Sequence, residues 1–172
     1  MFRLRITGLI AVLAVTLASC AGEPEPPPAQ PTFYRSLASP GAQVDATAAA
    51  SMISGFRQNN GLGPVTLDPV LMQLAQTQAT AMAGRDKLDH ESKGAFGKRM
   101  QQSGFDPKVT VENVSAGYHT LAEAFSGWRD SPPHRAHMLQ TGVTRIGIAA
   151  VYTPTSKYKV YWALILAAPS GT

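Results

Sequence analysis

Residues 145–167 read RIGIAAVYTPTSKYKVYWALILA, and this stretch decides the fold class of the chain. Residues 145–152 and 160–167 are rich in β-branched, aromatic and other apolar side chains, and the segment Thr153-Pro154-Thr155-Ser156-Lys157 lies between them. Two such runs around a segment of turn-forming residues predict a β-hairpin. We therefore expect an antiparallel pair of strands in the C-terminal part of the chain.

Helical patterns precede this hairpin. Apolar residues at helical spacing predict helices over residues 46–59, from 69 to about 83, over 95–103, over 120–128 and, after a pair of prolines, over 134–139. Asp45 and Asp68 are placed to cap the first two helices, and Gly84 is expected to end the second. Residues 109–114 read as a short strand. Because helices come first and paired strands last, we predict an α+β domain with a largely antiparallel sheet rather than a βαβ fold.

The N-terminal residues are typical of an export signal. A basic stretch, residues 1–5, is followed by a mostly apolar run of 13 residues, Ile6 to Ala18, whereas a membrane-spanning helix needs about 20. The sequence Leu17-Ala18-Ser19-Cys20 resembles the lipobox of bacterial lipoproteins, in which the cysteine becomes the acylated first residue. We predict that residues 1–20 are a lipoprotein signal peptide ending at lipidated Cys20. The alternative is an ordinary signal peptide, but Cys20 is the single cysteine of the chain and has no disulfide partner in it.

Composition divides the remaining chain into two parts. Residues 21–43 are rich in proline and alanine and are expected to form an extended tether, and residues 44–172 are expected to form one domain. The formal net charge of the chain is +4, and its basic residues are scattered rather than clustered, so we expect no nucleic-acid partner. The expected location is the cell envelope, lipid-anchored and extracytoplasmic, on the periplasmic side or the cell surface, with the membrane as a partner through acylated Cys20.

Familiar catalytic signatures are missing from the sequence. The zinc-protease pattern H-E-x-x-H is absent, and no G-x-S-x-G turn accompanies Ser131 and His134. The only cysteine belongs to the expected anchor. Among the polar residues, Glu112 stands out because valines surround it, and such a carboxylate should face solvent or bond to a donor. The motifs therefore name no established enzyme class.

The order of the short motifs resembles the CAP superfamily of cysteine-rich secretory proteins, antigen 5 and pathogenesis-related proteins, and its bacterial branch in particular. The resemblance covers essentially residues 48–168. It rests on the following stretches: Phe56-Arg57-Gln58-Asn59-Asn60-Gly61-Leu62-Gly63-Pro64-Val65, Leu67-Asp68-Pro69-Val70-Leu71, Leu88-Asp89-His90, Glu112-Asn113, Trp128 with Ser131 and His134-Arg135, Arg145-Ile146-Gly147-Ile148 and Tyr161-Trp162-Ala163.

The resemblance implies a three-layer α-β-α sandwich and a cleft lined by histidines and acidic residues. Carried onto this chain, the expected ligand-binding residues are His90, Glu112, Asn113, Ser131 and His134. Some members bind a divalent cation such as zinc, which would fall to His90 and His134, with His137 as a further candidate.

This chain also departs from the family pattern. Ser131 stands where many animal and plant members have a second glutamate, so the site has fewer acidic groups than the full tetrad. Val111 replaces the glycine of "G-E-N", and His137 replaces an asparagine.

Three functional hypotheses follow. The first is a binding module that presents the cleft to a lipid, a cell-wall fragment or an envelope protein, and this is the one we favour. The second is a metal-dependent hydrolase using His90, His134 and Glu112, with Glu112 as general base. The third is a structural envelope protein. Fold alone does not decide among them.

Overall fold

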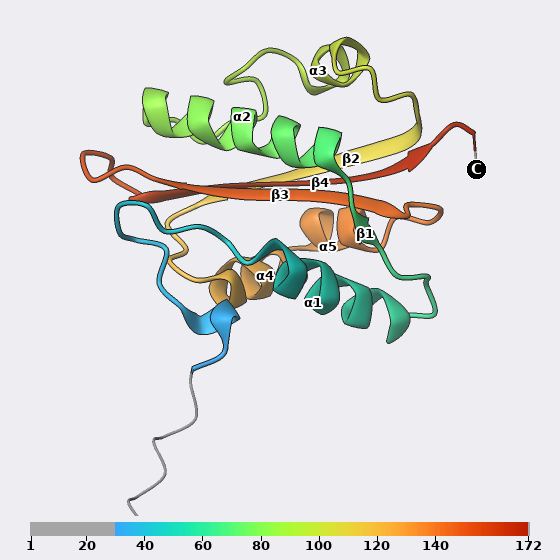
Figure 1. The fold of residues 1–172 in the computed structure, drawn as a ribbon, viewed down its shortest axis with the longest axis horizontal. Coiled ribbons are helices and arrows are strands. Elements are labelled where there is room, and N and C mark those ends of the chain that lie inside the picture. Colours follow the sequence, from blue (N-terminus) through green and yellow to red (C-terminus); the bar gives the residue numbers. More distant parts are fainter. Residues whose placement is uncertain (1–29, 172) are drawn as a thin grey trace, which may run out of the picture.

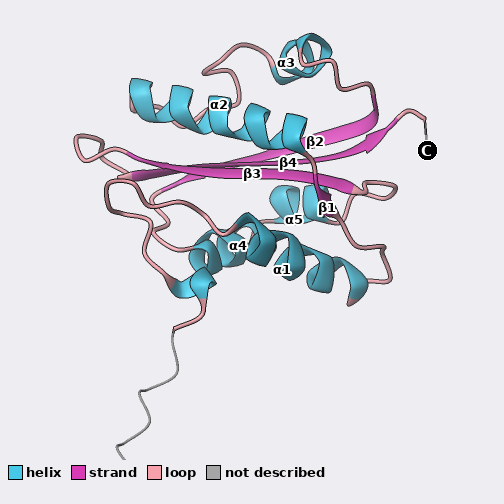
Figure 2. Ribbon diagram, viewed as in Figure 1, coloured by secondary structure: helices cyan, strands magenta, loops and turns pink. Residues whose placement is uncertain are grey.

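The structure is a computed structural model that describes residues 30–171, and it forms three layers (Figures 1 and 2). A four-stranded sheet lies in the middle. Helices α2 (Pro69–Arg85) and α3 (Phe96–Gln102) cover one face, and α1 (Ala46–Gln58), α4 (Leu121–Asp130) and α5 (Pro132–Met138) cover the other. The predicted α-β-α sandwich is confirmed.

The sheet has the strand order β1-β3-β4-β2. Strand β4 (Val160–Pro169) pairs antiparallel with both β2 (Pro107–Ala116) and β3 (Arg145–Tyr152), so the predicted hairpin of β3 and β4 is confirmed. Strand β1 (Thr66–Leu67) was not predicted and pairs in parallel with the start of β3. Two residues are too short a run for any periodic signal, so only the fold reveals this strand.

Strand β4 carries the two hydrophobic cores of the domain. It lies between β2 and β3 and is covered by helices on both faces, which explains its continuous apolar run. Because successive side chains point to opposite faces, Trp162 and Leu164 pack toward α1 and α4, whereas Tyr161 and Ala163 pack toward α2.

Capping residues set the helix starts where the sequence placed them. The Asp45 carboxylate accepts a hydrogen bond from the backbone of Ala48 at 2.9 Å, and Asp68 accepts from Val70 at 2.9 Å at the start of α2. Helix α2 runs past Gly84, its predicted end, to Arg85. The stop comes at Asp86, whose left-handed backbone (φ 48°) is held in place because the hydroxyl of buried Tyr161 donates to its carboxylate.

Helix α2 and β3 approach each other very closely at Gly147. A Cβ atom at this position would lie 2.1 Å from the carbonyl carbon of Leu71 in α2. On the α2 side, Ala75 and Ala79 are fully buried. Small side chains on both elements therefore allow the helix to lie directly on the sheet.

The buried Arg57 joins α1 to the loops around it. The residue is 1% exposed, and its guanidinium donates to four backbone carbonyls, those of Gly63, Met138, Gln140 and Val143. Burial lowers the pKa of this guanidinium. Arg57 therefore connects the end of α1 to the end of α5 and to the segment that leads into β3.

The described part of the predicted tether, residues 30–43, packs on the domain. Leu37 is 5% exposed within the core that faces α1, and its amide donates to the carbonyl of His119 at 2.7 Å. A 3-10 helix covers Thr32–Tyr34, and the Thr32 hydroxyl donates to Asp45 at 2.7 Å. A few apolar side chains among the prolines are therefore sufficient to dock this segment on the domain, ahead of the boundary expected at Val44.

The expected signal peptide, Cys20 and the tether up to residue 29 lie outside the described residues. Within residues 30–171, no helix combines the length and the apolar character needed to cross a membrane.

Candidate functional site

Glu112, in the middle of β2, is the centre of the candidate site. Its side chain is 1% exposed, and Nη2 of Arg99 in α3 donates to both carboxylate oxygens, at 3.0 and 2.8 Å. The Arg99 side chain is itself only 5% exposed. The two charges therefore form a buried ion pair that joins α3 to the sheet. Arg99 is thus the donor that Glu112 was expected to need among its neighbouring valines.

Arg99 also positions the loop before α3. Its Nε donates to the carbonyl of Gly94 at 3.0 Å, and Nη2 donates to the carbonyl of His90 at 3.1 Å. The guanidinium lies over the ring of Phe96, 5.1 Å from its centroid. One buried cation thus holds both the acidic residue of the site and the loop that carries the first histidine.

His90 faces Glu112 from this loop. Its Nδ1 lies 3.0 Å from Oε1 of Glu112, and the imidazole is about half exposed. Because a carboxylate held by Arg99 accepts hydrogen bonds, Nδ1 carries a hydrogen, and in the neutral imidazole Nε2 is then the acceptor.

Asp89 stabilises the turn that contains His90. Its carboxylate accepts from the Ser92 hydroxyl at 2.7 Å and from the Glu91 amide at 2.9 Å, and it pairs with Lys87. Hydrogen bonds from Lys87 and then Ser92 lower the pKa of Asp89 to about 2. The carboxylate is therefore ionised at any physiological pH, and the turn keeps its shape.

Helix α5 contributes the second half of the site. The Ser131 hydroxyl lies 2.9 Å from Nδ1 of His134, and the Asn113 side chain donates to the His134 carbonyl at 3.0 Å. Nδ1 of His137 lies 2.8 Å from Oδ1 of Asn113 and 3.1 Å from the carbonyl of Glu112. Since both neighbours accept, His137 Nδ1 is the donor, and Nε2 is the acceptor in the neutral imidazole.

All the residues named from the sequence belong to one hydrogen-bonded network. It runs from His90 through Glu112 to His137, then through Asn113 to His134 and Ser131. We call these six residues the histidine site. The sequence did not predict Arg99, the buried partner of Glu112, as part of this site. A glutamate among valines needs a donor, and the predicted helix over residues 95–103 contains an arginine, so the pairing could have been considered. Val111, which replaces the family's glycine, simply continues β2 opposite Leu166.

The surroundings of His134 favour its neutral imidazole. Burial lowers the pKa of His134 below its usual 6.5, and the nearby charges of His137 and then His90 lower it further. His134 is therefore uncharged at neutral pH. His119, by contrast, is exposed and acts at the start of α4, where its amide donates to Glu123 at 2.7 Å.

The donor set fits a metal ion poorly. Within residues 30–171, no group of three or more His, Cys, Asp or Glu side chains is arranged to hold one. Both carboxylate oxygens of Glu112 are engaged by Arg99. The described residues therefore do not supply the three or four protein ligands that zinc sites use.

Comparisons with known proteins agree with this architecture. The sequence profile of CAP, the cysteine-rich secretory protein family, matches residues 50–166. The uncharacterized protein YkwD of Bacillus subtilis is 31% identical over 97 residues, which are 55% of this chain and 38% of that protein. This chain thus spans less than half the length of that relative.

Two solved structures share the fold. An extracellular protein of Bacillus anthracis containing an SCP domain superposes with a TM-score of 0.62 at 19% identity, over 71% of this chain and 39% of that one. An outer surface protein of Borrelia burgdorferi superposes with a TM-score of 0.65 at 18% identity, over 76% of this chain and 99% of that one.

Proposed function

This chain belongs to the CAP family of cysteine-rich secretory proteins, and from that premise we propose that it is a membrane-tethered extracytoplasmic binding module. In this proposal Cys20 carries the lipid anchor, and the histidine site receives a ligand of the cell envelope. The proteins it resembles in fold include one described as extracellular and one described as an outer surface protein, which supports an extracytoplasmic location.

The observation that carries the proposal is the way the imidazoles are held. Each of His90, His134 and His137 has its Nδ1 engaged by a neighbouring protein group. In the neutral imidazoles, the Nε2 atoms of His90 and His137 are therefore acceptors, and they suit a ligand that brings hydroxyl or amide donors. Cell-wall fragments carry both kinds of donor, and lipid headgroups or an envelope protein are the other ligand classes to screen.

Hydrolysis is the less favoured function because of Glu112. A general base must take a proton, but this carboxylate is buried against the Arg99 guanidinium and hydrogen-bonded to His90. The Ser131 hydroxyl, just before α5, bonds to His134 in the first turn of that helix, without the strained turn of a nucleophile. The geometry thus favours recognition over bond cleavage.

Ligand titrations test the binding proposal. Solubilised peptidoglycan fragments and phospholipid vesicles are titrated against the wild type, a His90→Gln/His134→Gln variant and a His119→Gln control. We expect binding that is lost in the double variant and kept in the control, because His119 lies outside the site. If each probe binds the wild type, the double variant and the control with equal affinity, a role for the histidine site is refuted.

A zinc titration by calorimetry tests the hydrolase alternative. Stoichiometric binding that disappears in the His90→Gln/His134→Gln variant would favour a metal site and justify a hydrolase screen. Within the described residues, no three side chains are arranged to hold a metal ion. We therefore expect the wild type to bind zinc no more tightly than the variant does.

Membrane fractionation tests the anchor. We expect Cys20→Ala to release the protein from the membrane fraction, whereas Ser19→Ala, which keeps a small residue before the cysteine, leaves it there. Membrane retention and mass that do not change in Cys20→Ala would refute lipidation.

A further inference from the structure

The outer edge of β3 is covered by another strand only at its beginning. Strand β1 pairs Thr66 with Arg145 and Leu67 with Ile146, and the amide of Asp68 then donates to the carbonyl of Ile146 at 3.0 Å. The chain next turns away into α2. Within residues 30–171, no strand pairs with this edge from Ile148 to Tyr152.

Alternate residues of β3 direct their backbone groups to this open edge. In an antiparallel pair, every second residue bonds to the neighbouring strand and the residues between them point away. The bond from the Thr153 amide to the carbonyl of Lys159, at 2.8 Å, places the odd-numbered residues against β4. Ile148, Ala150 and Tyr152 therefore point outward. The Ile148 amide meets only the sulfur of Met72, a weak acceptor, at 3.3 Å.

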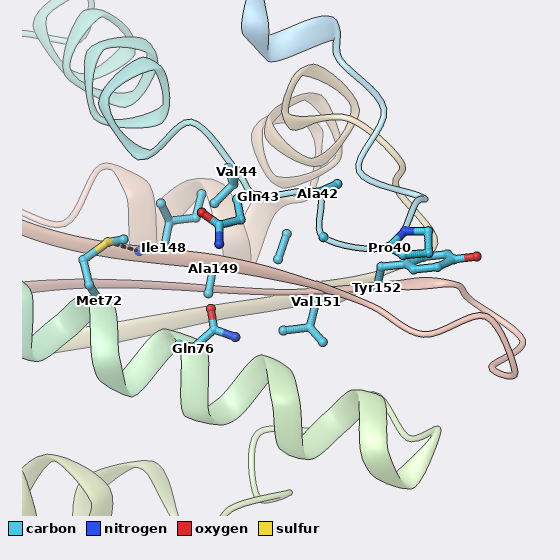
Figure 3. A pocket seen from close by; sticks show the side chains of 12 residues that line it. Pro40, Ala42, Gln43, Val44, Met72, Gln76, Ile148, Ala149, Val151 and Tyr152 are labelled. Atoms are coloured by element: carbon cyan, nitrogen blue, oxygen red, sulfur yellow. Dashed lines mark hydrogen bonds between the residues drawn. The ribbon is translucent and has the colours of Figure 1, made fainter.

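A groove follows the open edge (Figure 3). It is a cavity of about 400 Å³, with residues 148–152 of β3 along its floor. Met72 and Gln76 of α2 line one side, and the segment of residues 40–44 lines the other. The amides of Gln43 and Gln76 point toward the strand from opposite sides. Because the central floor residues are Ala149 and Ala150, little side-chain volume fills the space.

We propose that this groove binds an extended peptide segment of a partner protein as an added strand beside β3. An extended backbone presents N–H and C=O groups at a repeat of about 6.8 Å, which matches the outward groups of Ile148, Ala150 and Tyr152. The bound strand continues the line of β1 along the edge. The two glutamine amides lie where polar side chains of such a peptide, threonine or serine, would meet them.

The recessed position of the edge selects a single strand over a second copy of this chain. Two β3 edges would have to approach to about 4.8 Å to pair. The α2 helix and the 40–44 segment of each copy flank the edge on both sides (Figure 3) and would meet first. An isolated peptide has no such flanks and can enter.

This groove is separate from the histidine site. The strand order β1-β3-β4-β2 puts β3 and β2 on opposite sides of β4, with Glu112 and Asn113 on β2. At the outer edge of β2, the carbonyl of Glu112 already accepts a hydrogen bond from the His137 imidazole. A protein strand at β3 and an envelope ligand at the histidine site can therefore be held at the same time.

Peptide selection with two matched variants tests the proposal. A phage-displayed library of dodecapeptides is selected on the purified full-length protein in detergent, and the selected peptides are measured by fluorescence anisotropy. We expect Gln76→Trp, which fills the groove from α2, to weaken binding at least tenfold. Gln73→Trp, the same change on an exposed position of the same helix outside the groove, should bind like the wild type.

Hydrogen exchange locates the bound strand. We expect the peptide to slow exchange of the Ala150 and Tyr152 amides at least tenfold and to leave Val151, already bonded to β4, unchanged. Failure to select any peptide, equal binding by Gln76→Trp, or protection outside β3 would overturn the proposal. Protection of Ala150 that rises with protein concentration without peptide would overturn it in favour of a second copy.

Discussion

The buried pair of Arg99 and Glu112 yields the sharpest test of the site. The perturbation is Arg99→Met, which keeps much of the apolar volume and removes the guanidinium. The Glu112 side chain, 1% exposed, then keeps only the His90 imidazole as a donor. Removing one partner of a buried ion pair costs about 3–5 kcal/mol, because the remaining charge stays buried without compensation.

This loss is large enough to measure by two methods. Urea unfolding followed by circular dichroism gives the free energy of unfolding, provided that the slope m is unchanged. At about 4 °C per kcal/mol for a domain of this size, the midpoint of thermal unfolding should fall by about 12–20 °C. Arg129→Met is the control, because Arg129 pairs with Asp130 on the surface, with side chains 43% and 66% exposed, and its loss should not change stability measurably.

A double variant separates the ion pair from simple packing. Glu112→Leu alone should also be strongly destabilising, because it leaves the Arg99 cation buried. The combination Arg99→Met/Glu112→Leu should recover most of the loss, since an apolar pair of similar volume carries no desolvation penalty. Losses that simply add in the double variant, or an Arg99→Met loss below about 1 kcal/mol, would refute the reasoning.

Three further predictions concern the packing and charge of the domain. Gly147→Ala should destabilise by about 1–3 kcal/mol or more, because its Cβ would overlap the α2 backbone, whereas Gly84→Ala has open space and should not; equal melting temperatures would contradict this. By NMR, His134 should titrate below 6.5, and His137→Gln should move its pKa up toward that value. Since the folded pKa is lowered, the stability contributed by neutral His134 is full above pH 6.5 and declines as pH falls toward the folded pKa; titration at or above 6.5 would overturn the assignment. Arg57→Met should cost about 3 kcal/mol or more in urea unfolding, because four carbonyls lose their donor, and a loss below about 1 kcal/mol would show that water replaces it.

Local signals made most of the fold predictable. The β3–β4 hairpin followed from two apolar runs around a turn segment, and the starts of α1 and α2 followed from Asp45 and Asp68. These features depend on residues close together in the chain, so the sequence displays them directly. The continuous apolar run of β4 likewise reflects burial on both faces.

Features that depend on distant residues were missed or misplaced. Strand β1 forms only because the fold brings Thr66 and Leu67 beside the start of β3, about 80 residues later in the chain. These two residues carry no pattern of their own. Residues 30–43 looked like a tether by composition, yet Leu37 fills a core position that α4 and the preceding loop create. Composition averages over a segment, whereas docking depends on one or two side chains.

The candidate site divides in the same way. The sequence by itself indicated the candidate residues of the site, because His90, Glu112, Asn113, Ser131 and His134 stand in motifs whose order can be read from the chain. Only the tertiary structure decided their states: it buries Glu112 against Arg99, fixes Nδ1 of His90 and His137 as donors, and leaves the edge of β3 open. The hydrogen bonds that set those states join residues between 9 and 25 positions apart in the chain. Burial, hydrogen-bond partners and an unpaired strand edge are defined only once the layers have packed.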